Sequence, residues 1–481
     1  MEVKGKKEKG KGGKTGAVIA SVAKQSHIGE MSRQRTRMNS DARAKVKPLK
    51  RLLDAYQGHL TKALALANSF IKRGAPEFIL VLLCGCSAKM PLPPSPQSVP
   101  FGSGDTTYIH LAPDWTSNNG VSLSQPGDIV VGPDGQAFVA DQGHGRIVAY
   151  DRSGASVAGA GLDRLTGFDS LEAIGQDEKL NLYIVTGGST VWYWNQYVNQ
   201  AGVQAVLDYF VVYDTLTTDT LNLTFGEFDS LNASAPGRYD PFDLVLSDDP
   251  ARSDSALGPS IFYQEPSGHA RYRGVSGGPD ETVYVCDMYF DQVTRLTLKY
   301  RNLVQLCDGS FGYTYYGVYD RPVATYGTGM GTTIDPAGVF IQVQGGQHYI
   351  YFAQTGGNFL VQKIREQAVG DFFEAFGPND DIMQLGRFAA PRDVWVAEQY
   401  LGNNWIFVAD TDSNRIQVFD PSGDFLMYAG ERDSSGVLIF DELDHPQGVA
   451  HFEGILYVAD TGNNRIARYA LSTDVENIPG E

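Results

Sequence analysis

The sequence predicts an all-β fold, a six-bladed β-propeller that follows a non-globular N-terminal segment. Three short runs of β-branched and aromatic residues end in Asp141, Asp410 and Asp460, and each is followed by a turn and an Arg-Ile pair. Weaker copies of the run end at Thr186, Asp287 and Gln354. Repeated strands of this length indicate a radial array of small sheets. The lack of helical periodicity between the runs disfavours a parallel α/β fold.

Charge divides the chain into two parts. The whole chain of 481 residues carries a formal net charge of −17. Residues 1–85 hold 18 basic and 6 acidic residues, which leaves 21 basic and 50 acidic residues for the remainder. A body this acidic excludes nucleic-acid binding by the propeller, because that function needs a basic footprint.

Residues 1–70 are basic and lack a pattern of regular structure. We expect them to be disordered, or to be a mis-annotated extension whose true translation start lies between Leu64 and Asn68. The alternative is a basic cytoplasmic tail that binds nucleic acid or anionic lipid. In either case these residues are left out of the fold prediction.

Residues 71–85 have the features of an export signal. The apolar run Phe78–Leu83 is too short to span a bilayer, and Lys72 and Arg73 supply a basic flank. The segment Leu-Cys-Gly-Cys-Ser at 83–87 resembles the lipobox of bacterial lipoproteins. The resemblance implies that Cys86 is lipidated and anchors the protein in the bacterial cell envelope, facing the periplasm or the exterior. A short buried strand with an incidental Cys is the alternative.

Residues 86–100 form a Pro-rich stretch that we expect to be an extended tether. The body that follows contains the repeats. Its last copy has Pro-Gln-Gly-Val-Ala at 446–450, Tyr-Val-Ala-Asp at 457–460 and Asn-Arg-Ile at 464–466, and the copies at 391–420 and 126–147 keep this order. The pattern resembles that of NHL repeats. It implies that residues 101–475 form a β-propeller and that residues 476–481 are a tail.

The spacing of the repeats predicts the blade number. The six run ends are separated by 45, 101, 67, 56 and 50 residues. The gap of 101 must hold either an insertion or a seventh, degenerate blade. The stretch 225–269 is rich in Asp, Ser, Pro and Gly, which favours a long excursion over a further blade.

Residues that recur in every close copy are predicted to support their own blade. Asp141, Asp410 and Asp460 are suited to accept backbone N–H bonds in the following turn. The Arg five positions after each Asp can pair with its carboxylate. Repetition around a ring therefore indicates structure rather than chemistry.

Candidate binding residues lie in the hairpin that follows the second strand, where the copies differ from one another. In NHL-like propellers such hairpins resemble ligand-facing loops at one end of the channel. The candidates for binding a protein or glycan are His144, Tyr289, Phe290, Asn358, Asn414 and Asn463. The alternative for Tyr289 and Phe290 is packing on a neighbouring blade.

Catalytic and metal motifs are not evident. The six His of the body have no metal-ligand spacing, and the chain has no nucleophile elbow and no phosphate loop. No cofactor and no metal is therefore predicted, although Ca²⁺ or Zn²⁺ held by residues from distant blades stays open. His445 precedes the Pro of its repeat, which favours a structural role.

Two cysteines of the body raise the question of a disulfide. We expect Cys286 and Cys307 on the second and fourth strands of one blade, at the same end. Two strand spacings exceed the usual Cα separation of a disulfide. A distorted Cys286–Cys307 disulfide and two buried free thiols both remain open.

The predicted function is a lipid-anchored envelope protein whose propeller is a binding or scaffold module for a protein or glycan. Its predicted partners are the membrane, through the lipid, and that ligand. The alternative is a propeller enzyme, a metal-dependent hydrolase or lyase that works in the central channel. A structural component without a ligand is the third reading.

Overall fold

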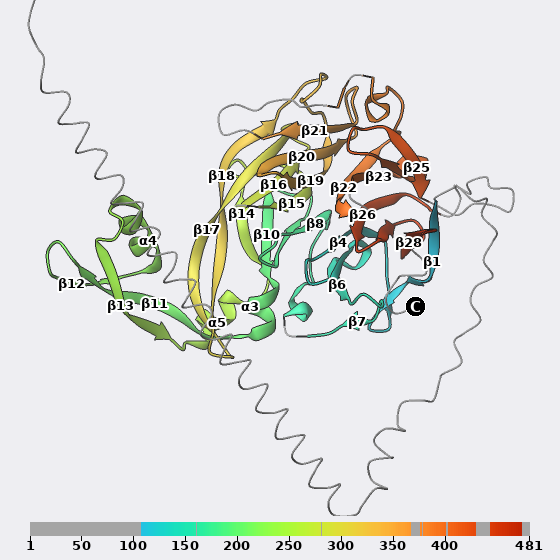
Figure 1. Cartoon of the computed structure of the whole chain (residues 1–481). Coiled ribbons are helices and arrows are strands. Elements are labelled where there is room, and N and C mark those ends of the chain that lie inside the picture. Colours follow the sequence, from blue (N-terminus) through green and yellow to red (C-terminus); the bar gives the residue numbers. More distant parts are fainter. Residues whose placement is uncertain are drawn as a thin grey trace, which may run out of the picture. The chain divides into compact units, whose positions relative to one another are not determined.

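The computed structural model describes residues 107–159, 161–279, 281–366, 376–377, 379–400, 403–429 and 443–473. They form a β-propeller whose six sheets surround a central channel (Figure 1). The innermost strand of each sheet contacts the innermost strand of the next sheet, and the sixth contacts the first. The ring is therefore closed with six blades, as predicted.

Each blade runs from an inner strand at the channel to an outer strand at the rim. The inner strands are β4 (Pro126–Val131), β8 (Ala173–Gln176), β15 (Tyr272–Gly278), β19 (Pro336–Gln344), β22 (Pro391–Tyr400) and β26 (Pro446–Phe452). The second strands are β5 (Ala137–Asp141), β9 (Asn181–Val185), β16 (Thr282–Asp287), β20 (Gln347–Gln354), β23 (Asn403–Asp410) and β27 (Ile455–Asp460). The third strands are β6 (Arg146–Tyr150), β10 (Thr190–Asn195), β17 (Gln292–Leu306), β21 (Val361–Arg365), β24 (Arg415–Phe419) and β28 (Arg465–Leu471). The fourth, outer strands of five blades are β7 (Ser156–Val157), β14 (Ser260–Gln264), β18 (Phe311–Ala324), β25 (Phe425–Ala429) and β1 (Tyr108–Trp115). In the described residues, the blade of β19 has three strands and ends with β21.

The first described strand closes the ring. β1 pairs antiparallel with β28, so residues from the two ends of the propeller sequence share the last blade. The register runs from Tyr108 opposite Leu471 to Trp115 opposite Ile466, with an irregularity after Leu111. This pairing covers the outer edge of β28, and β1 becomes the outer strand of the last blade.

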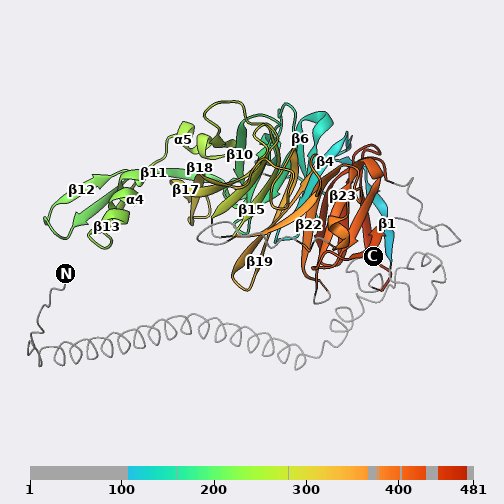
Figure 2. The same ribbon diagram turned by 90° about the horizontal axis from the view of Figure 1, so that it is seen from above.

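The gap of 101 residues holds a lobe and not a seventh blade. Between β10 and β14 the chain forms α3 (Gln196–Ala201), β11 (Val203–Asp214), β12 (Thr220–Leu223), α4 (Phe225–Ser234), β13 (Tyr239–Ser247) and α5 (Pro250–Ala256). β11 pairs with the far end of β17, which together with β18 extends beyond its blade. The elements around α4 project from the propeller (Figures 1 and 2). The predicted excursion is confirmed.

The strand register defines the two ends of the propeller. Pro126, Pro391 and Pro446, which begin three inner strands, lie opposite Asp141, Asp410 and Asp460, and a bulge follows each Pro. The inner strands therefore begin at the end that carries the hairpins between second and third strands. We call this the hairpin end. The opposite end, with the turns between first and second strands, is the turn end.

The core lies between the blades. Six clusters of buried side chains each join two neighbouring sheets. Since a single four-stranded sheet cannot cover both of its faces, stacking on two neighbours buries them. Trp395 on β22 is half-buried and packs against three of these clusters.

The remaining described elements are short. They are the hairpin β2 (Ser117–Asn118) and β3 (Val121–Ser122) and the 3-10 turns η1 (Gln142–His144), η2 (Leu162–Arg164), η3 (Asp381–Met383) and η4 (Thr411–Ser413). Within the described ranges, no helix has the length and apolar character needed to cross a bilayer. The basic extension 1–70, the signal 71–85 with Cys86, the tether 86–100 and the tail 476–481 lie outside the described residues.

Candidate functional site

The repeated Asp of each close copy organises its own hairpin. Asp141 Oδ2 accepts hydrogen bonds from Arg146 Nε at 2.7 Å and lies 2.9 Å from His144 Nδ1. Asp460 Oδ2 accepts from Arg465 Nε at 2.7 Å and from Asn463 Nδ2 at 2.8 Å. Asp410 Oδ2 accepts from Arg415 Nε at 3.2 Å. The predicted pairing of Asp with Arg is confirmed in all three blades.

The second oxygen of these carboxylates accepts its hydrogen bond from a different segment than predicted. It accepts a backbone N–H from the segment before the inner strand and not from the following turn. The donors are Ser124, Ala389 and Asp444, at 2.7–2.8 Å. Asp287 accepts both kinds of bond, from the N–H of Arg271 and from that of Tyr289, each at 3.0 Å. The register explains the difference, because the end of the second strand lies opposite the start of the first.

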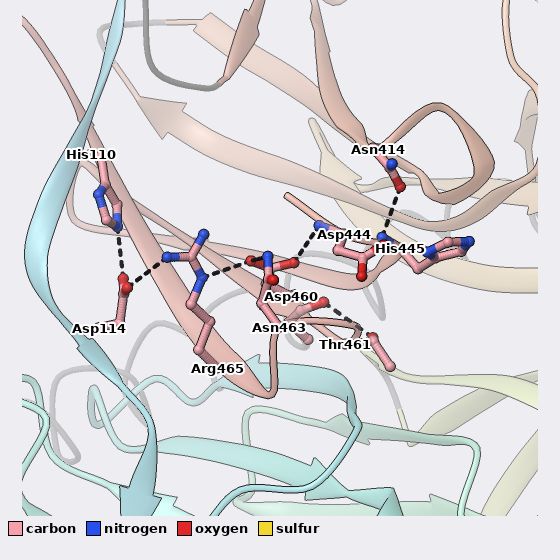
Figure 3. Close-up of polar contacts among 10 residues, drawn as sticks. His110, Asp114, Asn414, Asp444, His445, Asp460, Thr461, Asn463 and Arg465 are labelled. Atoms are coloured by element: carbon pink, nitrogen blue, oxygen red, sulfur yellow. Dashed lines mark hydrogen bonds and ion pairs between the residues drawn. The ribbon is translucent and has the colours of Figure 1, made fainter. Parts of the chain in front are cut away.

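Figure 3 shows how the last blade extends this cluster to β1. Arg465 lies between Asp460 and Asp114 of β1, with Nη1 2.8 Å from Asp114 Oδ2. His110 Nε2 lies 2.7 Å from the other oxygen of Asp114. Burial raises the pKa of Asp460, whereas the N–H of Asp444, Asn463 and Arg465 lower it. The cluster thus links the first described strand to the last blade of the propeller.

Neighbouring blades are also joined at the hairpin end. Thr461 Oγ1 donates to the carbonyl of Pro126 at 2.8 Å, and Thr411 Oγ1 donates to that of Pro446 at 2.7 Å. Asn414 Oδ1 accepts the backbone N–H of His445 at 2.9 Å (Figure 3). The repeated hairpin residues therefore fix blade geometry, which supports the structural role expected of His445.

Four of the predicted binding residues make such structural contacts. His144 and Asn463 bond the Asp of their own blade, and Asn414 bonds the next blade. Asn358 Nδ2 donates to the carbonyl of Thr328 at 3.4 Å. A role in ligand binding stays a prediction for all four.

Tyr289 and Phe290 form an exposed aromatic group at the hairpin end. Tyr289 is 55% exposed and stacks on His269 with ring centroids 5.6 Å apart. Phe290 is 39% exposed and meets Tyr289 edge-on at 4.9 Å. The three side chains come from two loops of the same blade, so Tyr289 and Phe290 stay available to solvent.

Cys286 and Cys307 do not form a disulfide. Both are free, Cys286 is buried and Cys307 is exposed. Cys286 pairs with Val293 near the start of β17, whereas Cys307 follows Leu306 at the far end of that strand. Their expected placement at the same end of one blade was wrong because β17 is 15 residues long and leaves the blade.

A cavity of about 420 Å³ occupies the channel, and residues of all six inner-strand segments line it. At the hairpin end, each of the six inner-strand segments contributes one residue. In five blades it is the second residue of the inner strand, and in the blade of β8 it is the residue just before the strand. This ring, the mouth ring, consists of Gly127, Glu172, Arg273, Ala337, Arg392 and Gln447. Unlike the hairpin Asp and Arg, these residues do not repeat from blade to blade.

The mouth ring carries two arginines and one glutamate. Neither Arg273 nor Arg392 forms a hydrogen bond or ion pair with any residue that the structure describes. Burial lowers the pKa of Arg392, and the nearby charge of Arg273 lowers it further, while Glu172 acts in the opposite direction. Two positive charges therefore lie close together at the channel wall.

Two carboxylates lie one position deeper, of which Asp128 is buried and Asp393 half-buried. Asp128 accepts the N–H of Ile129 and, from the next blade, that of Ile174, both at 2.8 Å. Asp393 accepts the N–H of Val394 at 2.8 Å and that of Val449 of the next blade at 2.9 Å. Burial raises the pKa of Asp393 to about 7. Burial also raises the pKa of Asp128 well above its ordinary value, and the charge of Asp393 adds to this.

The middle of the channel is aromatic. Phe340 of β19 and Trp395 of β22 are half-buried, line the cavity and lie with ring centroids 4.7 Å apart. Equivalent positions on β8 and β15 hold the small residues Gly175 and Ser276. The cavity thus combines a charged ring with an interior in which an aromatic pair lies beside polar residues.

Metal ligands are not gathered in the part of the chain that the structure describes. No group of three or more His, Cys, Asp or Glu side chains there could hold a metal ion. The carboxylates that line the cavity include Asp128 and Asp393, whose four oxygens already accept backbone N–H bonds.

The sequence prediction missed the mouth ring. Its members are separated by whole blades in the sequence, and no local motif marks them. One signal was available for four of the six members, since the residues after the repeated Pro align with one another and differ in every copy. It does not reach Glu172 or Arg273, which follow other residues.

Comparisons with known proteins give no family for the chain. No family model matches, and no curated protein matches. Among solved structures, virginiamycin B lyase from Staphylococcus aureus is 11% identical over 76% of this chain and 99% of its own, with a TM-score of 0.38. An auxiliary nutrient binding protein from Bacteroides thetaiotaomicron is 11% identical over 73% and 69%, with a TM-score of 0.41. A gluconolactonase from Xanthomonas campestris is 10% identical over 77% and 99%, with a TM-score of 0.40. Likenesses this weak carry no function to this chain.

Proposed function

We propose that the protein is a binding module of the bacterial cell envelope that receives a protein or glycan ligand at the hairpin end of its propeller. The observation that carries this proposal is the cavity of about 420 Å³, whose size falls within the range of ligand sites and whose lining combines apolar residues with charged and polar ones. The residues that line the cavity reach both ends of the channel. The exposed group of His269, Tyr289 and Phe290 lies at the hairpin end and adds contact area suited to a partner.

A photo-crosslinking experiment tests this proposal. Benzoylphenylalanine replaces Tyr289 at the hairpin end in the full chain, expressed in its native host. The matched control places the same group at Glu453, whose side chain is 55% exposed at the turn end. We expect one defined adduct from position 289 and none from position 453. Equal capture from both positions, or none from 289, would contradict a ligand site at the hairpin end.

The anchor is the second part of the proposal. We propose that Cys86 carries a lipid, on the strength of the lipobox-like segment 83–87 and of the tether that follows it. The Cys86→Ala variant is expected to leave the membrane fraction and to lose incorporation of a palmitate analogue. A variant that keeps both properties would contradict the anchor, while leaving the ligand site untouched.

A further inference from the structure

The mouth ring carries two positive charges within a body that is otherwise acidic. From Cys86 onward the chain holds 21 basic and 50 acidic residues. Against this background Arg273 and Arg392 line one cavity, close enough for the charge of one to lower the pKa of the other. Two neighbouring positive charges without a described partner cost free energy, which an anion between them would recover.

The positions of the two arginines leave space for such an anion. Arg273 lies at the start of β15 and Arg392 at the start of β22, on either side of β19. The intervening strand contributes Ala337 and then Gly338, neither of which fills the space with a long side chain. A guanidinium presents a planar set of donors that suits a carboxylate.

The charge of the ring indicates the charge of the ligand. Glu172 supplies one negative charge against the two arginines, and its effect on the pKa of Arg392 is to raise it. Within the mouth ring itself, one further negative charge would balance the two arginines. Asp412 also raises the pKa of Arg392, and Asp128, Asp177, Glu178 and Asp393 line the cavity beyond the ring. The aromatic pair Phe340 and Trp395, which lines the same cavity, offers an apolar surface for the rest of the molecule.

From these observations we propose that the channel cavity binds a small organic monoanion, a carboxylate with an aromatic or aliphatic body, between Arg273 and Arg392. This proposal rests on the proposed function, because the small monoanion represents a carboxylate-bearing group of the protein or glycan ligand that would enter the channel at the mouth ring. The carboxylate lies at the mouth ring and the apolar body reaches Phe340 and Trp395.

The experiment uses a matched pair of probes on the full chain. Isothermal titration compares naphthalene-2-carboxylate with its neutral analogue, naphthalene-2-carboxamide. We expect the carboxylate to bind at least about tenfold more tightly than the amide, and the Arg273→Gln/Arg392→Gln variant to reduce its affinity to that of the amide. Affinity for the amide should change by less than about twofold in the variant.

The matched control is Arg271→Gln, which removes an exposed positive charge two residues from Arg273. Arg271 Nη1 donates to the carbonyls of His269 and Ala270, so its guanidinium is already engaged. This variant should bind the carboxylate as the unmodified chain does.

Three results would overturn the monoanion site. They are equal affinity for the carboxylate and the amide, unchanged carboxylate affinity in the double variant, and no carboxylate binding at millimolar concentration. Inorganic phosphate binding as tightly as the naphthoate would overturn it as well, because the apolar body would then contribute nothing. None of these results alters the crosslinking outcome at position 289, so failure of this proposal is distinguishable from failure of the proposed function.

Discussion

Arginine serves two purposes in this molecule, and the hairpins and the mouth ring show them side by side. In the hairpins, Arg146, Arg415 and Arg465 recur, and each contacts the buried carboxylate of its own blade. In the mouth ring, Arg273 and Arg392 occur in two blades only and have no ion-pair partner among the described residues. An Arg that recurs and is paired with a carboxylate therefore indicates a structural role. An Arg that departs from the repeat and has no such partner among the described residues indicates a candidate binding site.

The largest expected effect comes from breaking a hairpin cluster. Asp460→Ala removes a fully buried carboxylate, which takes one acceptor from Arg465 and leaves the N–H of Asp444 without its acceptor. We expect a loss of about 3–5 kcal/mol in the free energy of unfolding, measured by urea denaturation.

The control for this change is Glu453→Ala, which removes an exposed ion pair with Arg152 at 2.6 Å. Surface pairs of this kind contribute at most about 1 kcal/mol. Equal losses of unfolding free energy in the two variants would show that the hairpin clusters do not stabilise the blades.

A second substitution tests the close packing between the inner strands of neighbouring blades. A Cβ at Gly448 would lie 2.6 Å from Asp128 Cα of the neighbouring blade. Gly448→Ala should therefore cost about 2 kcal/mol or more in thermal or urea unfolding. Gly188→Ala is the comparison, because a Cβ there meets nothing within 4 Å, and it should leave stability nearly unchanged.

Stability should also depend on pH through the carboxylates below the mouth ring. In the unfolded chain an Asp titrates near about pH 4, whereas the pKa of Asp393 in the fold is about 7. Between these values the folded state binds more protons, so the free energy of unfolding falls as pH rises and levels off above about 7. We expect a decrease of about 2–2.5 kcal/mol from pH 5 to pH 7.5.

The Asp393→Asn variant provides the check on that slope. Its amide does not titrate, so its stability should change less over the same pH range. A slope as steep as that of the unmodified chain would assign the dependence to other groups.

The sequence was sufficient for the architecture because the architecture repeats. The run ends at Asp141, Asp410 and Asp460, with their weaker counterparts, give the six blades and locate the excursion. The closing strand β1 was not predicted, since its eight residues contain Pro113 and copy no repeat. Residues that meet only through ring closure leave no local pattern.

The candidate site was harder to predict for a related reason. The predicted residues followed the hairpins, and His144 and Asn463 contact the Asp of their own blade. Arg273 and Arg392 become neighbours only when the blades assemble, because each comes from a different inner strand. A spacing rule in the sequence could not reveal that proximity.

The most direct test of the contrast is a matched pair of variants, Arg392→Gln and Arg465→Gln, each measured for urea unfolding and for naphthoate affinity. We predict that Arg392→Gln keeps the free energy of unfolding within about 0.5 kcal/mol and loses affinity. Arg465→Gln should lose about 3 kcal/mol of stability, because Asp460 and Asp114 lose their shared partner, yet keep the affinity of its folded fraction. An Arg392→Gln protein that unfolds as readily as Arg465→Gln and binds naphthoate unchanged would contradict the separation of structural from ligand-binding arginines.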